Sequence, residues 1–236
     1  MWDFEQGEVL AFDKPLHWTS FDLVAKVRHN VCRKIGKKKL KVGHSGTLDP
    51  LATGVVIVCT GKKTKLIDQL QYDVKEYIAT LQLGATTPSF DLEKEIDATY
   101  PAEHITRELI DKTIPEFVGE QWQVPPMFSA VQINGKRAYE FARKGESVEL
   151  KPKLLVIDEI EVLDFDEEKK QLTIRVVCSK GTYIRALARD IGERLGSGAH
   201  LTALRRTRVG DTRVEDCLTI DTFLEQLKQY DYVQNE

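Results

Sequence analysis

The residues with the clearest potential for chemistry lie between Gly43 and Gly54, in the run Gly-His-Ser-Gly-Thr-Leu-Asp-Pro-Leu-Ala-Thr-Gly. The acidic group of this run is Asp49, between Leu48 and Pro50. Pro50 fixes its own φ angle and biases Asp49 towards an extended backbone, so a stiff segment holds the carboxylate. An ionised and oriented carboxylate can act as a nucleophile or a base. The alternative is an Asp-Pro turn, in which the carboxylate only caps nearby N–H groups.

A phosphate-binding loop is another function that a glycine-rich segment suggests, and the spacing excludes it here. Gly54 and Gly61-Lys62 are separated by six residues that form a predicted strand. The phosphate loop instead needs four flexible residues before its Gly-Lys pair.

The element that must position Asp49 is the strand that follows it. Residues 55–59 are β-branched apart from the last and show no alternation, which predicts a strand buried on both faces. The loop before it therefore lies at the edge of a rigid core, where sites are often built. Upstream, residues 8–12 predict a short strand. Thr19 or Ser20 can then cap a helix with one apolar face of Leu23, Val24, Val27 and Val31.

The rest of the chain alternates between predicted strands and helices. Residues 76–83 alternate in polarity and predict a half-buried strand that places Tyr77 in the apolar set. The other predicted elements are a loop at 86–99, a helix at 106–117 disturbed by Pro115, a strand at 125–133 turning at Asn134-Gly135, a helix at 138–143, strands at 154–165 and 171–179, a helix that begins near Arg185 and runs to about 195, and a last helix at 221–229.

Composition is typical of a globular protein of 236 residues, with 42% hydrophobic and 30% charged residues. A chain of this length can bury a sizeable core in one large domain with a smaller attachment. No apolar run approaches a membrane span, and the N-terminus lacks a secretion signal. The four cysteines are widely spaced, which predicts reduced thiols in a cytoplasmic protein and no metal site.

The net charge of −3 conceals a segregated pattern. Residues 26–41 contain eight basic side chains and no acidic one, and an arginine-rich cluster spans residues 185–213, whereas acids concentrate at 91–120 and after 215. Such segregation can present a basic face to phosphates on a nearly neutral molecule. For residues 37–41 alone, a solvated lysine-rich loop is the alternative.

The run from Gly43 to Gly54 resembles the catalytic-aspartate motif of the TruB family of tRNA pseudouridine synthases. Asp13-Lys14-Pro15, with Trp18-Thr19-Ser20, resembles the family's first motif, although His17 replaces its usual glycine. We expect Lys14-Pro15 to shape the wall behind the site. Residues 125–145 resemble a stretch that separates this family from other pseudouridine synthases, and residues 198–207 are the last match. The C-terminal RNA-binding module of many bacterial relatives is expected to be absent.

The resemblance implies roles for individual residues. Asp49 would be the catalytic carboxylate, Tyr77 would stack on the target uracil, and Arg185 would pair with the aspartate. Tyr183 would line the same pocket and Leu204 would pack against the base. Considered separately, Tyr77 could be a core tyrosine, Arg185 a surface arginine and Leu204 a core leucine.

His44 lies next to the aspartate loop, where it could occupy the gap left by the extracted base or contact the flipped neighbours. A turn histidine is the alternative. Desolvation by Leu48, Leu51 and Leu204 would raise the pKa of Asp49, and Arg185 would oppose this change.

The implied reaction converts uridine 55 in the T-loop of tRNA to pseudouridine. The bond between C1′ and N1 breaks, the base turns, and C1′ rejoins the ring at C5, with no cofactor or metal. The uridine must first be flipped out of the folded loop. Whether Asp49 attacks the sugar, attacks the ring or removes a sugar proton stays open. The expected partner is tRNA, which binds through its T-arm and elbow. The protein is expected to be a monomer and to have no membrane partner.

The implied fold is α+β: a long mixed, largely antiparallel sheet flanked by helices, in one catalytic domain over 1–236 with an inserted subdomain near 86–150. Two other functions remain open. An RNA chaperone would need the basic faces and Tyr77 but not Asp49. The same chemistry could also act on another RNA, which the resemblance at 125–145 disfavours.

Overall fold

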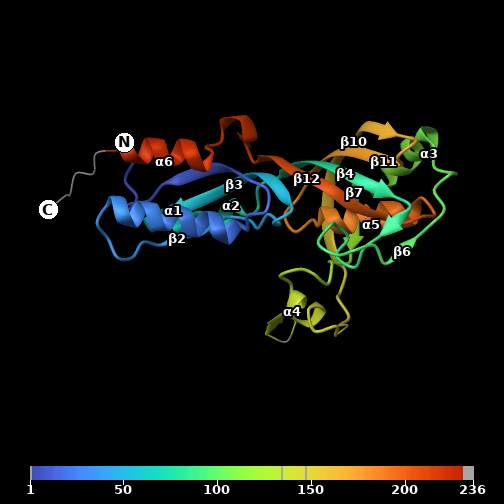
Figure 1. Ribbon diagram of the computed structural model, residues 1–236, viewed down its shortest axis with the longest axis horizontal. Helices are drawn as coiled ribbons and strands as arrows, with labels where there is room; N and C mark the ends of the chain where they lie inside the picture. Colours follow the sequence, from blue (N-terminus) through green and yellow to red (C-terminus); the bar gives the residue numbers. More distant parts are fainter. Residues whose placement is uncertain (1, 134, 147, 231–236) are drawn as a thin grey trace. The chain divides into compact units, whose positions relative to one another are not determined.

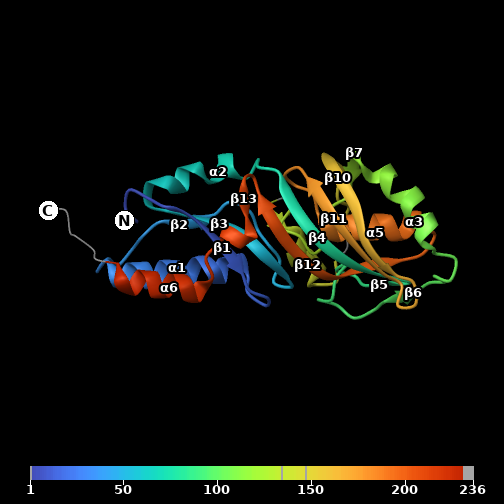
Figure 2. The same cartoon turned by 90° about the horizontal axis from the view of Figure 1, so that it is seen from above.

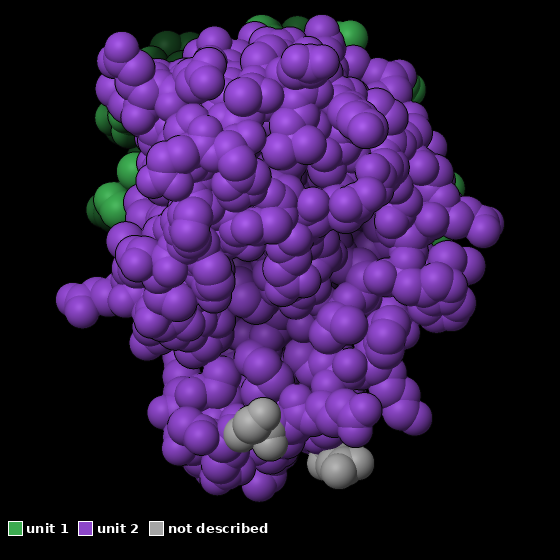
Figure 3. All heavy atoms as spheres, turned by 90° about the vertical axis from the view of Figure 1, so that its right-hand side faces the viewer, with its two compact units in different colours: residues 1–76, 205–236 green, residues 77–204 purple. Residues whose placement is uncertain are grey.

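The computed structural model describes residues 2–133, 135–146 and 148–230 (Figure 1). The chain divides into two compact units, coloured separately in Figure 3: unit 1 is residues 1–76 and 205–236, and unit 2 is residues 77–204. Strands β4 (Lys75–Leu83) and β12 (Ala199–Val209) cross the boundary along the chain. The single catalytic domain with an insertion near 86–150 stays a prediction.

Unit 1 is a small antiparallel sheet covered by helices on both faces. Strand β3 (Ala52–Thr60) pairs with β1 (Val9–Lys14) and with the short edge strand β2 (Val42–His44). Helices α1 (Ser20–Lys34) and α6 (Ile220–Gln229) lie side by side on one face, and the 3₁₀ turn η1 (Gly61–Leu66) leads into α2 (Ile67–Leu70) on the other (Figure 2). The short elements β13 (Thr212–Arg213) and η3 (Val214–Asp216) connect β12 to α6.

The core of unit 1 follows from two sequence features that the analysis above predicted. Residues 55–60 of β3 are all buried, which confirms a strand covered on both faces. Helix α1 begins with a capping box in which Thr19 and Asp22 exchange hydrogen bonds. Its apolar face is buried as expected, through Leu23, Val24, Val27 and Val31.

Unit 2 is a twisted sheet with strand order β12-β4-β11-β10-β7. The long hairpin of β10 (Lys153–Asp166) and β11 (Gln171–Cys178) is antiparallel, and β7 (Gly119–Gln123) pairs with the start of β10. The helical elements are α3 (Arg107–Thr113), η2 (Ile114–Phe117), α4 (Ala138–Ala142) and α5 (Ile184–Arg194). Two small hairpins complete the unit, β5 (Ala85–Thr86) with β6 (Ala98–Thr99) and β8 (Gln132–Ile133) with β9 (Lys136–Arg137).

One predicted strand differs from the structure observed. The strand expected over residues 125–133 is reduced to Gln132–Ile133, because Pro125 and Pro126 have no N–H group to donate to a ladder. Of the expected turn at Asn134-Gly135, Asn134 lies outside the described residues. The helix expected at 106–117 changes from α3 to η2 immediately before Pro115, which confirms the expected disturbance. Within the described ranges, no helix has the length and apolar character needed to cross a bilayer.

Candidate active site

Asp49 lies in unit 1, in the loop that joins β2 to β3, and its side chain is half-buried. The backbone around it is held on both sides. Asp49 O accepts a hydrogen bond from Ala52 N at 3.0 Å, and Pro50 O accepts one from His17 N at 2.7 Å. His17 has a φ angle of 67°, in the left-handed region that favours glycine. The residue that replaces the family's glycine therefore keeps a backbone conformation typical of glycine.

Ser20, the first residue of α1, attaches the loop to the helix. Its Oγ accepts a hydrogen bond from Leu48 N at 2.8 Å and donates one to Leu48 O at 3.1 Å. Both residues are buried. Since Thr19 supplies the helix cap, Ser20 is free to bind both backbone polar groups of the residue that precedes Asp49.

Arg206, on β12, holds the other half of the loop. This arginine is 3% exposed and donates from Nε to Val55 O at 2.7 Å. Its two terminal nitrogens donate to Gly46 O at 3.2 Å and to Thr47 O at 3.3 Å. One guanidinium thus binds three main-chain carbonyls of the loop and of β3.

Gly54 makes this arrangement possible. Its φ angle is +110°, and a Cβ atom at this position would lie 2.1 Å from Arg206 O. A side chain would push β12 away from β3, so the last glycine of the motif is required by a close approach of two backbones.

Lys14 is a buried cation behind the loop. Its Nζ donates to Pro15 O at 2.9 Å and to Trp18 O at 2.6 Å. Loss of hydration on burial lowers the pKa of Lys14 to about 8, and the Asp49 carboxylate partly opposes this change. Lys14 therefore lies within electrostatic reach of Asp49, and its expected place in the wall behind the site stays a prediction.

His44 is the last residue of β2 and is half-buried. Gly46 N donates to His44 Nδ1 at 3.3 Å. Loss of hydration on burial lowers the pKa of His44, and the charge of Arg206 adds to the effect. The ring is therefore mainly neutral at neutral pH, and its turn contact agrees with the structural alternative. A role beside a flipped base stays a prediction.

Arg185 lies in unit 2, on the first turn of α5, and is 6% exposed. Its terminal nitrogens donate to Ser89 O at 3.1 Å and to Phe128 O at 2.9 Å, and its Nε lies 3.7 Å from Asp91 Oδ2. The alternative of an exposed surface arginine is therefore wrong. Pairing with Asp49, a residue of the other unit, stays a prediction.

The other expected site residues also lie in unit 2. Tyr77 is 8% exposed and belongs to the buried face of β4, as its alternation predicted. Tyr183 precedes α5, and its N–H donates to Gln123 Oε1 at 2.9 Å. Leu204 is half-buried on β12. The structure thus places His44 at the end of β2, next to the loop that carries Asp49, and Tyr183 with Arg185 at the start of one helix.

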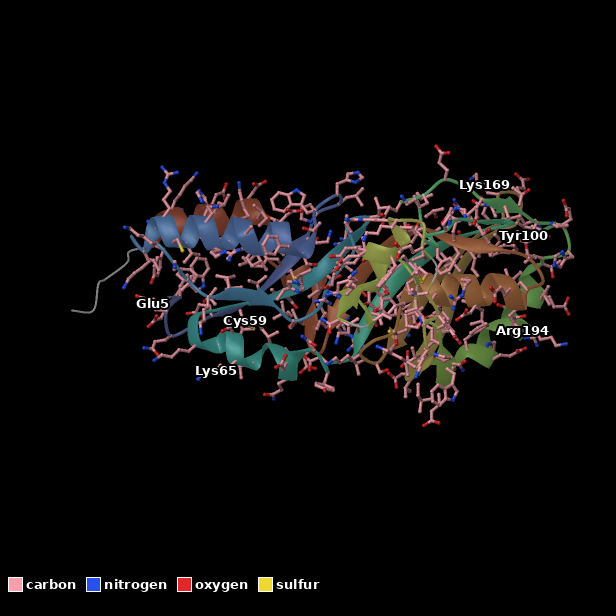
Figure 4. The ribbon with its side chains drawn as sticks, turned by 90° about the horizontal axis from the view of Figure 1, so that it is seen from below. Glu5, Cys59, Lys65, Tyr100, Lys169 and Arg194 are labelled. Atoms are coloured by element: carbon pink, nitrogen blue, oxygen red, sulfur yellow. The ribbon has the colours of Figure 1, made fainter. Side chains whose placement is uncertain are left out.

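The sequence did not reveal the roles of Ser20 and Arg206. Ser20 was one of two candidate helix caps, and Arg206 was one member of the arginine-rich cluster. That cluster is not an open basic surface, because most of its members bind partners within their own unit. Its ion pairs are Arg185 with Asp91, Arg189 with Asp190, Arg194 (labelled in Figure 4) with Glu116, Arg205 with Asp13, and Arg208 with Glu76.

The comparison with protein families gives two matches. The model for the TruB family pseudouridylate synthase N-terminal domain matches residues 33–184, and that for the tRNA pseudouridylate synthase B C-terminal domain matches residues 185–236. The expected absence of a C-terminal module is not confirmed, because a C-terminal domain of the family accounts for the end of this chain.

Individual relatives agree with these matches. The tRNA pseudouridine synthase B of Phocaeicola vulgatus is 68% identical over 227 residues, covering 96% of each chain. That of Bacteroides thetaiotaomicron is 65% identical over 236 residues, covering 99% of this chain and 98% of the relative.

Solved structures give the same fold. A Cbf5-Nop10-Gar1 complex contains a chain that matches 94% of this one with a TM-score of 0.68 and 28% identity. An H/ACA RNP bound to a substrate RNA containing 2′-deoxyuridine matches with a TM-score of 0.66 and 28% identity. Our chain spans about half of each, 54% and 53% respectively. The predicted α+β pseudouridine synthase fold, a mixed sheet flanked by helices, is confirmed. The chain belongs to the TruB family of pseudouridylate synthases.

Proposed function

We propose that this protein isomerises uridine 55 in the T-loop of tRNA to pseudouridine. Family membership and the names of the close relatives support the reaction and the class of RNA. The observation that carries the proposal is the fixed loop of Asp49, whose main chain is bound by Ser20 on one side and Arg206 on the other. A single carboxylate acts efficiently only when its position is set before the substrate arrives.

The isomerisation conserves every atom of the nucleotide. The bond from C1′ to N1 breaks, the ring turns, C1′ bonds to C5, and the proton on C5 is replaced by one on N1. Asp49 is the proposed catalytic group, as a nucleophile towards the sugar or the ring, or as the base that removes a sugar proton. No external oxidant, reductant or cofactor is needed for this balance.

The remaining residues are proposed to bind the flipped nucleotide. Unstacking a base costs on the order of a few kcal/mol. Stacking on Tyr77 would return roughly 1–3 kcal/mol. Tyr183 and Leu204 would contact the base, Arg185 would act on the charge of the aspartate, and His44, mainly neutral, would contact the bases that the uridine leaves.

Unmodified tRNA transcript provides the test, with pseudouridine mapped by position and RNA binding measured in parallel. We expect Asp49→Asn to bind tRNA with an affinity near that of the wild type and to form no product. Asp68→Asn, which removes an exposed carboxylate of the same unit, should remain active. Pseudouridine at another position of tRNA, or only in another RNA, would contradict the assignment of uridine 55 as the substrate. If the wild type binds tRNA without forming pseudouridine, the chaperone function replaces the enzymatic one.

The proposed partner is the T-arm and elbow of tRNA, with the enzyme acting as a monomer in the cytoplasm. Sedimentation of the protein alone and with one equivalent of tRNA would check the stoichiometry. A dimer in either sample would contradict the monomer.

A further inference from the structure

Unit 1 contains a second feature that the Asp49 loop does not use. A hollow with a volume of about 1220 Å³ lies along the edge strand β2, between the C-terminal half of α1 and the start of α2. Five cations line it, and no aspartate or glutamate does. We call it the basic hollow; its cations are Arg28, Arg33, Lys38, Lys39 and Lys41.

Apart from its cations, the lining of the basic hollow is mainly apolar. It includes Ala25, Leu40, Val42 and Ile67, with the half-buried Cys32 among them. All of the cations except Arg28 are exposed, so they would attract an anion through interactions that salt screens. The preferred ligand is therefore anionic and long enough to contact several cations.

Ordinary structural reasons explain only some of these cations. Arg33 lies in the last turn of α1, where a positive charge interacts favourably with the helix dipole. Lysines beside an edge strand discourage pairing with other chains. Arg28 fits neither reason, because it lies in the middle of α1, with its guanidinium 5.8 Å from the Phe21 ring.

The charges of the hollow are also uncompensated. In the described part of the chain, no ion pair joins any of its five cations to a carboxylate. The neighbouring lysines outside the lining differ, since Lys37 pairs with Glu5 (labelled in Figure 4) and Lys34 donates to Lys228 O. Five unpaired cations around one hollow repel each other, and a polyanion would relieve that repulsion.

The position of the hollow relative to Asp49 is set by α1. Ser20, at the first residue of this helix, binds Leu48 beside Asp49, whereas the hollow lies along its second half and the loop beyond. The part of the lining that α1 supplies runs from Ala25 to Arg33, which lie about 8 and 20 Å beyond Ser20 along the helix axis.

We propose that the basic hollow binds the phosphate backbone of an RNA stem, several base pairs from the nucleotide that reaches Asp49. The RNA is the tRNA of the proposed function, and the proposal rests on that function for the identity of the stem. Contacts of this kind position the RNA without reading its sequence.

The test compares two double variants that each remove two exposed lysines. Lys39→Ala/Lys41→Ala changes the basic hollow, and Lys112→Ala/Lys151→Ala is the matched control on unit 2. Each lost phosphate contact makes the negative slope of log K against log salt smaller in magnitude by about 0.9. At 0.1 M salt this corresponds to binding that is about tenfold weaker. We expect the hollow variant to bind tRNA at least about tenfold more weakly, with a slope reduced by about one to two. The control should change less than about threefold, and the kcat of the hollow variant at saturating tRNA should match that of the wild type.

A shortened substrate tests the distance. For a T-loop hairpin with a stem of three base pairs, the loss in affinity caused by the hollow variant should be smaller than for full-length tRNA, because the shorter stem covers less of the hollow. An equal loss for the hairpin and for full-length tRNA would overturn the proposal. If the hollow variant bound full-length tRNA with the affinity and salt slope of the wild type, the proposal would also be overturned. The alternative ligand of the hollow would then be an acidic protein.

Cys32 gives a second readout that needs no mutation. Bound tRNA should slow the alkylation of Cys32 by iodoacetamide several-fold and leave that of Cys217 unchanged, since Cys217 does not line the hollow. Equal alkylation of Cys32 with and without saturating tRNA would refute the proposal. Protection of Cys32 by tRNA that is never converted to pseudouridine would support the hollow and contradict the proposed function, so the two failures are distinguishable.

Discussion

Replacement of Gly54 by alanine tests whether the close contact between β3 and β12 maintains the Asp49 loop. Two costs add at this position. The φ angle of +110° is strained for any residue with a Cβ atom, by about 1–2 kcal/mol. The new Cβ would also lie 2.1 Å from Arg206 O, whereas real Cβ contacts are essentially never below 3.0 Å, so the strands must separate by about 1 Å. Such overpacking costs about 1–3 kcal/mol.

Gly36→Ala is the matched control in the same unit. Its φ angle is +68°, and nothing lies within 4 Å of the added Cβ, so only the backbone strain applies. We expect a loss in the free energy of unfolding of about 1 kcal/mol for Gly36→Ala and about 3 kcal/mol or more for Gly54→Ala. With a urea m-value of about 2 kcal/mol/M, the midpoints should fall by about 0.5 M and 1.5 M.

Activity provides the second readout of the Gly54 variant. A displacement of about 1 Å at a catalytic group can cost about 100-fold in rate. We expect kcat of Gly54→Ala on tRNA to fall by about that factor at a temperature where the variant is folded, and kcat of Gly36→Ala to stay near the wild-type value. Equal midpoints for the two variants, or a folded Gly54→Ala enzyme with normal kcat, would refute the reasoning.

Three further predictions concern the groups that hold the loop. Arg206→Met should lower the free energy of unfolding by about 2–5 kcal/mol, because three carbonyls lose a charged donor. An unchanged urea midpoint would contradict this prediction. Ser20→Ala should lower kcat more than Thr19→Ala. The Thr19 variant loses a helix cap worth about 1 kcal/mol but keeps the hydrogen bonds between Ser20 and Leu48. A tRNA turnover assay of both variants compares their kcat values. Lys14 binds fewer protons when folded than when unfolded between its folded pKa of about 8 and its usual value near 10.5, so stability should rise with pH in this window. Relative to Lys14→Met, the free energy of unfolding of the wild type should rise by about 3 kcal/mol at most across this window. Urea midpoints that change equally with pH in both proteins from pH 8 to 10 would contradict this prediction.

Much of unit 1 could be predicted because its signals are local. The uninterrupted β-branched residues of β3 and the cap and apolar face of α1 each depend on a few neighbouring residues, and so does the alternation that buries Tyr77 in unit 2. The strand expected at 125–133 failed for an equally local reason. Apolar residues suggested a strand there, but two adjacent prolines remove the donors that a ladder requires.

The groups that fix the loop could not be predicted, because their partners are distant in sequence. Arg206 binds Val55 O, 151 positions away, and Ser20 binds Leu48, 28 positions away. Periodicity carries no information about such pairs. The arginines of 185–213 show the same limit, since net charge counts side chains without showing which already have partners, as Arg205 has in Asp13.

The way the loop is held explains why catalysis and stability should be coupled in this protein. The groups that position Asp49 bind mainly the backbone: Ser20 binds Leu48, Arg206 binds Gly46 and Thr47, and His17 binds Pro50. The same hydrogen bonds join α1, β3 and β12, so a substitution that loosens the loop also loosens the unit. Variants of Arg206 or Gly54 should therefore lose activity and stability together, whereas Asp49→Asn should lose activity alone.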